Sequence, residues 1–141
     1  MTHATDIRHG RHCVFNLHVH LVFVTKYRKK IFNADLLAEL KSVLSSVCTD
    51  FEASLVEFNG ETDHVHLLIT YPPKVAISAL VNSLKGVSSR RLRCIPAARK
   101  GYYKQVLWSP SYFAASCGGA PLSILKQFIQ NQAAPSPSSP A

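Results

Sequence analysis

The segment 63–69 is the strongest constraint on the fold of this chain. Its sequence, DHVHLLI, places apolar residues at every second position from Val65 to Ile69. Alternation with a period of two is typical of a β-strand that buries one face. Because alternate side chains of a strand share a face, we predict that His64 and His66 point the same way while Val65 points into the core.

Two imidazoles presented together by a rigid strand can bind one divalent cation, since neutral imidazole is a common metal ligand. The alternative is a pair of half-exposed histidines on a solvated sheet face. A second pair with the same spacing, His18 and His20, lies in a predicted strand at 15–25. Both pairs share one face if the two strands are neighbours, and spacing alone does not choose between them.

The charge of the chain is unbalanced, with 16 Lys and Arg residues against 8 Asp and Glu residues and a net charge of +8. This excess predicts a polyanionic partner, and nucleic acid is favoured over an acidic membrane surface. A length of 141 residues suits one domain with a sizeable core. A hydrophobic content of 47% argues against a disordered chain.

Nothing in the composition indicates a membrane protein. No apolar run approaches the ~20 residues that span a bilayer, and the polar start does not resemble a signal peptide. The four cysteines are widely spaced and form no CxxC pair, so we interpret them as buried or incidental thiols. We therefore expect a cytoplasmic protein with no membrane partner.

The apolar patterns predict an α+β protein. Strands are predicted at 15–25, 53–58, 63–69 and 106–115, the last an edge strand interrupted by Pro110. Helices are predicted at 33–50, 75–94 and 121–132, the first of them capped by Asn33. Asn59-Gly60 is interpreted as the turn between the second and third strands, and 97–104 as a basic loop.

The order β-α-β-β-α-β followed by an extra C-terminal helix is the ferredoxin-like (RRM-like) split βαβ plan. A central antiparallel sheet in this plan carries its helices on one face. The first and third strands lie side by side at its centre. We therefore predict that His64 and His66 lie in the middle of the sheet on an accessible face.

Several basic groups are candidate nucleic-acid contacts. The residues concerned are Arg8 and Arg11 in a basic arm at 1–12, Lys26, Tyr27 and Arg28 after the first strand, and Lys85, Arg90, Arg91 and Arg93 in the second long helix, which also carries Ser83, Ser88 and Ser89. Basic and hydroxyl side chains contact phosphates, and an aromatic ring can stack on a base. The alternatives are a frayed terminus and solvated ends of the strand and helix. The Pro-, Ser- and Ala-rich tail 133–141 is predicted to be disordered.

Five segments together resemble one family. They are LHVHLVFVTKYRKKIF, DHVHLLI, LKGVSSRRLR, LWSPSYF and GGAPLSILKQFIQNQ, in that order along the chain. They are similar to the single-strand transposases of bacterial insertion sequences, the TnpA type of the HUH nucleases (the IS two-hundred/IS six-hundred-five group). The resemblance covers residues 13–132, and that range is expected to form the transposase domain.

The resemblance implies roles for individual residues. The family's paired histidines match His64 and His66, whereas His20 matches a histidine of the family's first strand. A glutamine that completes the metal site matches Gln132, and the implied ion is Mg²⁺ or Mn²⁺. Asp63 is a candidate partner that orients one imidazole.

This chain departs from the family's pattern at the position of the nucleophile. The tyrosine that attacks DNA stands four residues before the glutamine, and this chain has Phe128 there. Residues 128 and 132 share a helical face, but a phenyl ring has no oxygen to attack with. We interpret the chain as a deliberate variant that holds DNA uncleaved, in preference to a naturally decayed copy.

The resemblance also implies partners, namely single-stranded DNA hairpins at the ends of the element and a second copy in a homodimer. Three alternatives stay open. One is a non-catalytic RRM-like binding module, although the exposed aromatic pattern of such readers is absent from the sequence. Another is a metal-dependent hydrolase that uses water. The third is a domesticated REP-associated tyrosine transposase with the same motifs.

Overall fold

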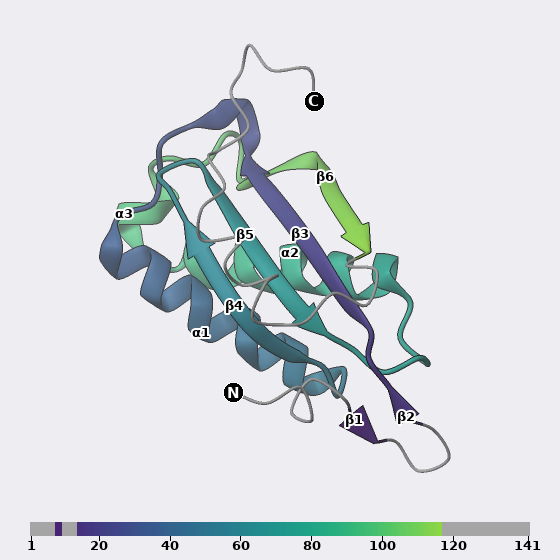
Figure 1. Cartoon of the computed structure of the whole chain (residues 1–141). Coiled ribbons are helices and arrows are strands. Elements are labelled where there is room, and N and C mark those ends of the chain that lie inside the picture. The colour runs from purple at the N-terminus through teal and green to yellow at the C-terminus, as the bar shows by residue number, and fades with distance from the viewer. Residues whose placement is uncertain (1–7, 10–13, 117–141) are drawn as a thin grey trace.

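The computed structural model describes residues 8–9 and 14–116. Four strands form one antiparallel sheet in the order β4-β5-β3-β6, and Figure 1 shows them lying across the molecule. Their bounds are His18–Thr25 for β3, Ser54–Gly60 for β4, His64–Thr70 for β5 and Trp108–Ser116 for β6. A separate two-stranded sheet joins β1 (Arg8–His9) to β2 (Val14–Phe15).

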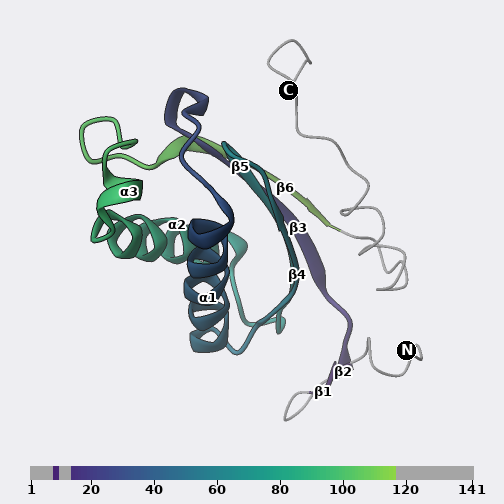
Figure 2. The same cartoon turned by 90° about the vertical axis from the view of Figure 1, so that its left-hand side faces the viewer.

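The helices cover one face of the four-stranded sheet, as Figure 2 shows. They are α1 (Ala34–Asp50), α2 (Ile77–Arg93) and the short α3 (Pro96–Arg99), and a 3-10 turn, η2 (Lys26–Arg28), follows β3. The first long strand, β3, and the histidine strand, β5, are neighbours at the centre of the sheet. The predicted ferredoxin-like α+β fold is therefore confirmed for the sheet and these helices. The predicted helix 121–132 and tail 133–141 lie outside the described residues.

Local sequence explains why α1 begins where it does. The side chain of Asn33 accepts a hydrogen bond from the backbone N–H of Leu36 at 2.9 Å, as the predicted cap requires. Leu40, Val43 and Leu44, at helical spacing, are buried against the sheet side of the helix. This stripe packs on the same face of β5 that carries Val65, so the core lies between the sheet and the helices.

The predicted turn at Asn59-Gly60 is wrong. Both residues belong to β4, where they pair with His66 and Val65, and the hairpin closes through a hydrogen bond from Glu61 N to His64 O at 2.9 Å. A side chain at Gly60 would place its Cβ 2.6 Å from Leu37 Cδ2 of α1. The glycine therefore permits the close approach of a helix rather than a turn.

Three other boundaries differ from the predictions. The chain is not one strand from 15 to 25, because residues 14–15 pair separately in β2. β6 runs through Pro110 without a break. Its pairing with β3 shifts register between Phe23 and Thr25, and this shift leaves Pro110 in a bulge. A bulge tolerates proline because the missing N–H is not needed for pairing there. The predicted loop 97–104 contains most of α3. Within the described residues, no helix is long and apolar enough to cross a membrane.

Candidate metal centre and nucleic-acid interface

All four strand histidines lie on the sheet face opposite the helices. The antiparallel register pairs Val22 with His66 and Val24 with His64, so alternate residues of β3 and β5, including His18 and His20, share that face. The expectation that this face is accessible is wrong at the histidines, because His64 is 1% exposed and His66 is 2% exposed.

Aromatic packing accounts for part of this burial. The rings of His20 and His66 stack with centroids 5.3 Å apart and planes inclined by 22°. The ring of Phe113, on the edge strand β6, meets His20 edge-on at 5.7 Å. His20, His64 and His66 thus form one packed cluster across the central strands, whereas His18 bonds to Asn16 and Thr70.

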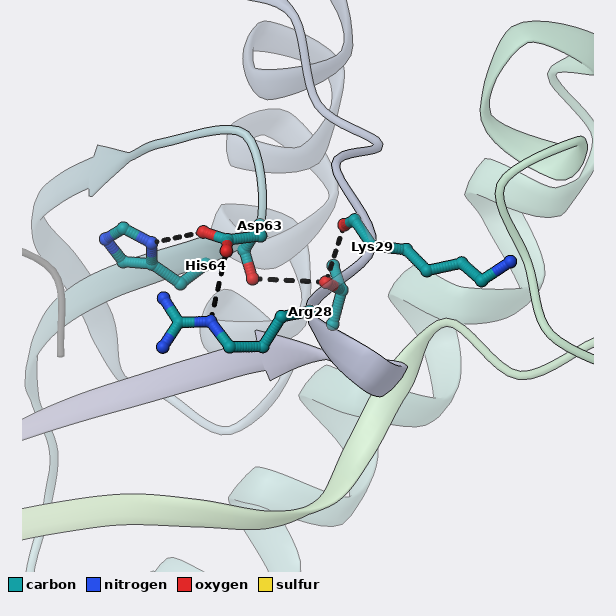
Figure 3. A network of polar contacts seen from close by, with 5 residues as sticks. Arg28, Lys29, Asp63 and His64 are labelled. Carbon is teal, nitrogen blue, oxygen red and sulfur yellow. Dashed lines mark hydrogen bonds and ion pairs between the residues drawn. The ribbon is translucent and has the colours of Figure 1, made fainter. Parts of the chain in front are cut away.

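Asp63 connects this cluster to the end of β3, as Figure 3 shows. Its Oδ1 lies 2.9 Å from Nδ1 of His64, and its Oδ2 accepts a hydrogen bond from Nε of Arg28 at 3.1 Å. The backbone carbonyl of Asp63 accepts from the N–H of Thr25 at 2.9 Å. Burial opposes ionisation of the carboxyl, but the hydrogen bonds and charges of His64 and Arg28 outweigh it and hold the pKa of Asp63 below its ordinary value.

The hydrogen bond with Asp63 determines which nitrogen of His64 carries the proton. An ionised carboxylate can only accept, so Nδ1 of His64 is the donor. In the neutral ring, Nε2 then keeps its lone pair. Carboxylate–histidine pairs of this kind orient the imidazoles that bind metals.

One ring nitrogen of His66 has no hydrogen-bond partner among the described residues. Nδ1 of His66 lies 3.1 Å from Nε2 of His20, whereas its own Nε2 is buried and makes no hydrogen bond within residues 8–9 and 14–116. Burial, reinforced by the charges of His20 and His64, lowers the pKa of His66 to about 4. The ring is therefore neutral at physiological pH, and with the proton on Nδ1 its Nε2 has a lone pair available to a metal ion.

The donor set fits a divalent cation in part. Two imidazole nitrogens are available from β5, but no group of three or more His, Cys, Asp or Glu residues in the described part of the chain could hold a metal ion. A further ligand must come from elsewhere. Gln132, the predicted one, lies outside the described residues, as does Phe128.

The basic residues predicted to contact nucleic acid lie in separate parts of the structure. Lys26, Tyr27 and Arg28 form η2, directly after β3, and Arg28 is tied to Asp63. Lys85 is half-buried and turned back onto the protein, because its Nζ donates to the carbonyl of Ser109 at 2.6 Å and lies over the ring of Tyr112. Burial lowers the pKa of Lys85. Arg8 belongs to β1 and Arg11 lies outside the described residues.

The C-terminal end of α2 faces a basic cavity. A hollow of about 480 Å³ is lined by Arg90, Arg93, Cys94, Arg99, Tyr102 and Gln105. Arg91 is exposed on the same helical turn. Ser88, interpreted above as a phosphate contact, is instead fully buried and accepts a hydrogen bond from Nε1 of Trp108 at 3.0 Å.

Two residues near these sites have contacts that were not predicted. His20 was considered as a candidate only in a competing pair with His18, yet it stacks on His66 and shares a hydrogen bond with it. The repeated His-x-His pattern was the available signal. Arg99 was predicted only to lie in a basic loop, whereas α3 places it beside Arg90 and Arg93 of α2 around one cavity.

Comparisons with known proteins assign this chain to a family. The sequence profile of the family described as "Transposase IS200 like" matches residues 13–132. The chain belongs to the IS200-like transposase family. It is similar to the ISDra2 transposase TnpA of Deinococcus radiodurans, with 28% identity over 128 residues that cover 90% of this chain and 91% of that protein. The transposase of insertion sequence element IS200 from Salmonella typhimurium is 28% identical over 122 residues, covering 86% of this chain and 80% of the relative.

Solved structures show the same fold as this IS200-like transposase. A crystal structure of a protein from Deinococcus radiodurans R1 assigned as a transposase aligns with a TM-score of 0.71 and 32% identity, covering 90% of this chain and 98% of that one. A REP-associated tyrosine transposase bound to a REP hairpin aligns with a TM-score of 0.59 and 11% identity, covering 86% of this chain and 67% of that one. The second likeness supports the fold alone.

Proposed function

We propose that this IS200-like transposase binds single-stranded DNA hairpins and carries a metal centre for strand cleavage, and that cleavage itself is lost because Phe128 replaces the nucleophile. One observation carries the proposal. On β5, the buried Nε2 of His66 has no partner within the part of the chain that the structure describes, and Asp63 orients the neighbouring imidazole of His64. A buried nitrogen without a partner is costly unless a ligand satisfies it.

His64, His66 and Gln132 are the residues that would hold Mg²⁺ or Mn²⁺. When bound, the ion supplies Lewis-acid polarisation of the scissile phosphate and charge stabilisation for the leaving 3′ oxygen. Asp63 keeps the proton on Nδ1 of His64, and the nitrogen on the far side of the ring is then free to ligate. Two imidazoles and an amide oxygen form a softer set than Mg²⁺ prefers, so Mn²⁺ is expected to bind more tightly.

The nucleophile explains both the activity of the family and its loss here. A tyrosine at position 128 would release its phenolic proton to water, and its oxygen would attack the phosphorus of a DNA phosphodiester, forming an O–P bond that leaves a 5′-phosphotyrosine. The bond from phosphorus to the 3′ oxygen breaks, and that oxygen takes a proton to become a 3′-OH. Phe128 keeps the ring but has no oxygen, so this chain can bind and hold the strand without cutting it.

Several observations support a DNA substrate. The net charge of +8 favours a polyanion, and the exposed side chains of Arg90 and Arg91 on α2 are of the type that contacts phosphates. A structural relative is bound to a REP hairpin, and we extend hairpin binding to this chain. We also propose a homodimer, as in the family that the sequence resembles.

The test compares this protein with its Phe128→Tyr variant on labelled single-stranded DNA from element ends, with Mn²⁺. We expect only the Phe128→Tyr variant to form a covalent adduct that survives denaturation. His66→Gln in the Phe128→Tyr background is the matched control, and it should bind DNA without forming the adduct.

Two results would contradict the proposal. Cleavage by the unaltered protein would place the nucleophile at another residue. If both proteins bind DNA and neither forms an adduct, the chain is a binding module without chemistry. This is the second candidate function, and it is favoured by Phe128 because a phenyl ring has no oxygen to attack with.

A further inference from the structure

Two exposed tyrosines meet at one end of the sheet, apart from the histidine cluster. Tyr27 of η2 is 67% exposed and Tyr103, in the loop before β6, is 36% exposed. Their ring centroids lie 5.0 Å apart with the planes at 90°. Exposed aromatic side chains are the usual stacking surface for unpaired bases, because every base has a π face.

A cation accompanies each ring. The Nζ atom of Lys26 lies 5.1 Å from the centroid of Tyr27, and that of Lys104 lies 5.4 Å from the centroid of Tyr103. Such ammonium groups beside exposed rings can pair with the phosphates of a strand whose bases lie on the rings. We call these two tyrosines and two lysines the tyrosine platform.

Two tight turns hold the platform in place. The backbone is left-handed at Tyr27 (φ 58°) and also at Lys104 (φ 47°), a conformation that costs free energy for residues other than glycine. Hydrogen bonds between Tyr103 and Val106, at 3.1 and 2.8 Å, close the second turn. The N–H of Lys26 donates to the carbonyl of Leu107 at 2.9 Å, so the two turns are fastened to one another at the same end of the sheet (Figures 1 and 2).

The basic cavity at the end of α2 adjoins this platform. Gln105, which follows Lys104 in the second turn, is one of its lining residues. Arg90, Arg93 and Arg99 line the same cavity, and the ion pairs of the described residues include no carboxylate that faces any of the three. Guanidinium groups without an acidic partner, around a cavity of about 480 Å³, are suited to phosphate oxygens.

We infer that the tyrosine platform stacks an unpaired base of single-stranded DNA while the arginines of the adjoining cavity bind the phosphates next to it. This inference rests on the proposed function in that it takes single-stranded DNA as the ligand. The platform is also linked to the candidate metal centre, because Arg28, next to Tyr27, pairs with the Asp63 that orients His64.

Equilibrium binding without metal tests the platform. Fluorescence anisotropy in EDTA would compare an oligothymidylate with an abasic oligonucleotide of the same length. We expect Tyr27→Ala to weaken binding of the oligothymidylate by about tenfold and to leave the abasic probe unchanged. Tyr27→Phe keeps the ring and should bind both probes as the unaltered protein does.

Salt dependence tests the cavity. Arg90→Gln and Arg99→Gln should weaken binding of both probes, and each should reduce the slope of log K against log salt by about 0.7. Lys41→Gln, an exposed site on α1 that changes the charge equally, is the matched control. The cavity assignment is overturned if the arginine variants behave like Lys41→Gln.

The remaining outcomes separate this site from the proposed function. Equal loss on both probes in Tyr27→Ala, or no loss on either, overturns the tyrosine platform while DNA binding by the protein stands. If the unaltered protein binds neither probe, the tyrosine platform fails, whereas hairpin binding is decided separately by the DNA from element ends, because neither probe forms a hairpin. The covalent-adduct assay does not depend on these affinities and tests the chemistry separately.

Discussion

Asp63 Oδ1 lies 2.9 Å from Nδ1 of His64, while the other oxygen of the same carboxylate accepts a hydrogen bond from Arg28 at 3.1 Å. One side chain thus fixes the imidazole at the start of β5 and ties it to the turn after β3. Asp63 and His64 are adjacent in sequence, whereas Arg28 reaches Asp63 only because the sheet places β3 beside β5. The ring of His64 is therefore oriented by a contact that depends on the fold as well as on local sequence.

Replacing this carboxylate should weaken metal binding. We expect Asp63→Ala to lower the affinity for Mn²⁺ by about 10- to 100-fold, because His64 loses the partner that fixes its tautomer and orientation. Calorimetric titration with Mn²⁺ measures the change. Asp50→Asn, at an exposed carboxylate on α1, is the matched control. Unchanged affinity in Asp63→Ala would show that the contact does not position a ligand.

Acid should destabilise the fold through His66. Its pKa is about 4 in the folded protein against an ordinary 6.5, so the unfolded state binds the proton more tightly. The free energy of unfolding is therefore unaffected by His66 above about pH 6.5. As the pH falls towards 4, protonation of His66 in the unfolded state lowers that free energy by up to about 1.4 kcal/mol per pH unit. His20, which faces His66, has a pKa lowered in the same direction by burial, and His64 faces it from the same strand.

Urea unfolding in EDTA at several pH values measures this dependence. His66→Gln should flatten the change of unfolding free energy between pH 6.5 and 4. An equally steep dependence in that variant would assign the effect to other groups.

Removing one hydroxyl in α2 should destabilise the core. Ser88 is fully buried and accepts the Nε1–H of Trp108 at 3.0 Å. Ser88→Ala leaves that indole donor buried without an acceptor, and we expect the free energy of unfolding to fall by about 1–3 kcal/mol. Urea unfolding compares it with Ser46→Ala, at an exposed position of α1. Equal stability of the two variants would contradict the assigned role of this hydrogen bond.

Two cysteines should differ sharply in reactivity. Cys48 is fully buried in α1, and burial raises the pKa of its thiol to about 12, whereas Cys94 is exposed. The thiolate is the reactive form, so Cys48 should resist iodoacetamide at pH 8 and Cys94 should be labelled. Peptide mapping by mass spectrometry reads each site separately. Labelling of Cys48 should appear only in urea, and its rapid labelling in native buffer would contradict the packing described here.

Local patterns were sufficient for much of the fold. The alternation in β5, the helical spacing of Leu40, Val43 and Leu44, and the Asn33 cap each depend on residues close together in the chain. Period and capping are properties of short segments, so they can be read without knowing what packs on them. The same holds for the shared face of His64 and His66.

Strand and turn boundaries were less predictable. Gly60 looked like a turn residue, but the reason for glycine there is a side chain of α1 that lies 23 residues earlier in the chain, at Leu37. Pro110 looked like a break, but a bulge absorbs it because β3 continues to pair on either side. Both features are set by neighbours that a local pattern does not contain.

The sequence by itself determined which residues alternate, where α1 begins and that two histidines share one face of a strand. Only the tertiary structure decided that His20 stacks on His66, that Arg28 reaches Asp63, that Ser88 is a core residue and that Tyr27 meets Tyr103. The physical reason is the range of the interactions. Periodicity reports the backbone of one segment, whereas ring stacking, burial and ion pairing depend on which distant segments the sheet places side by side.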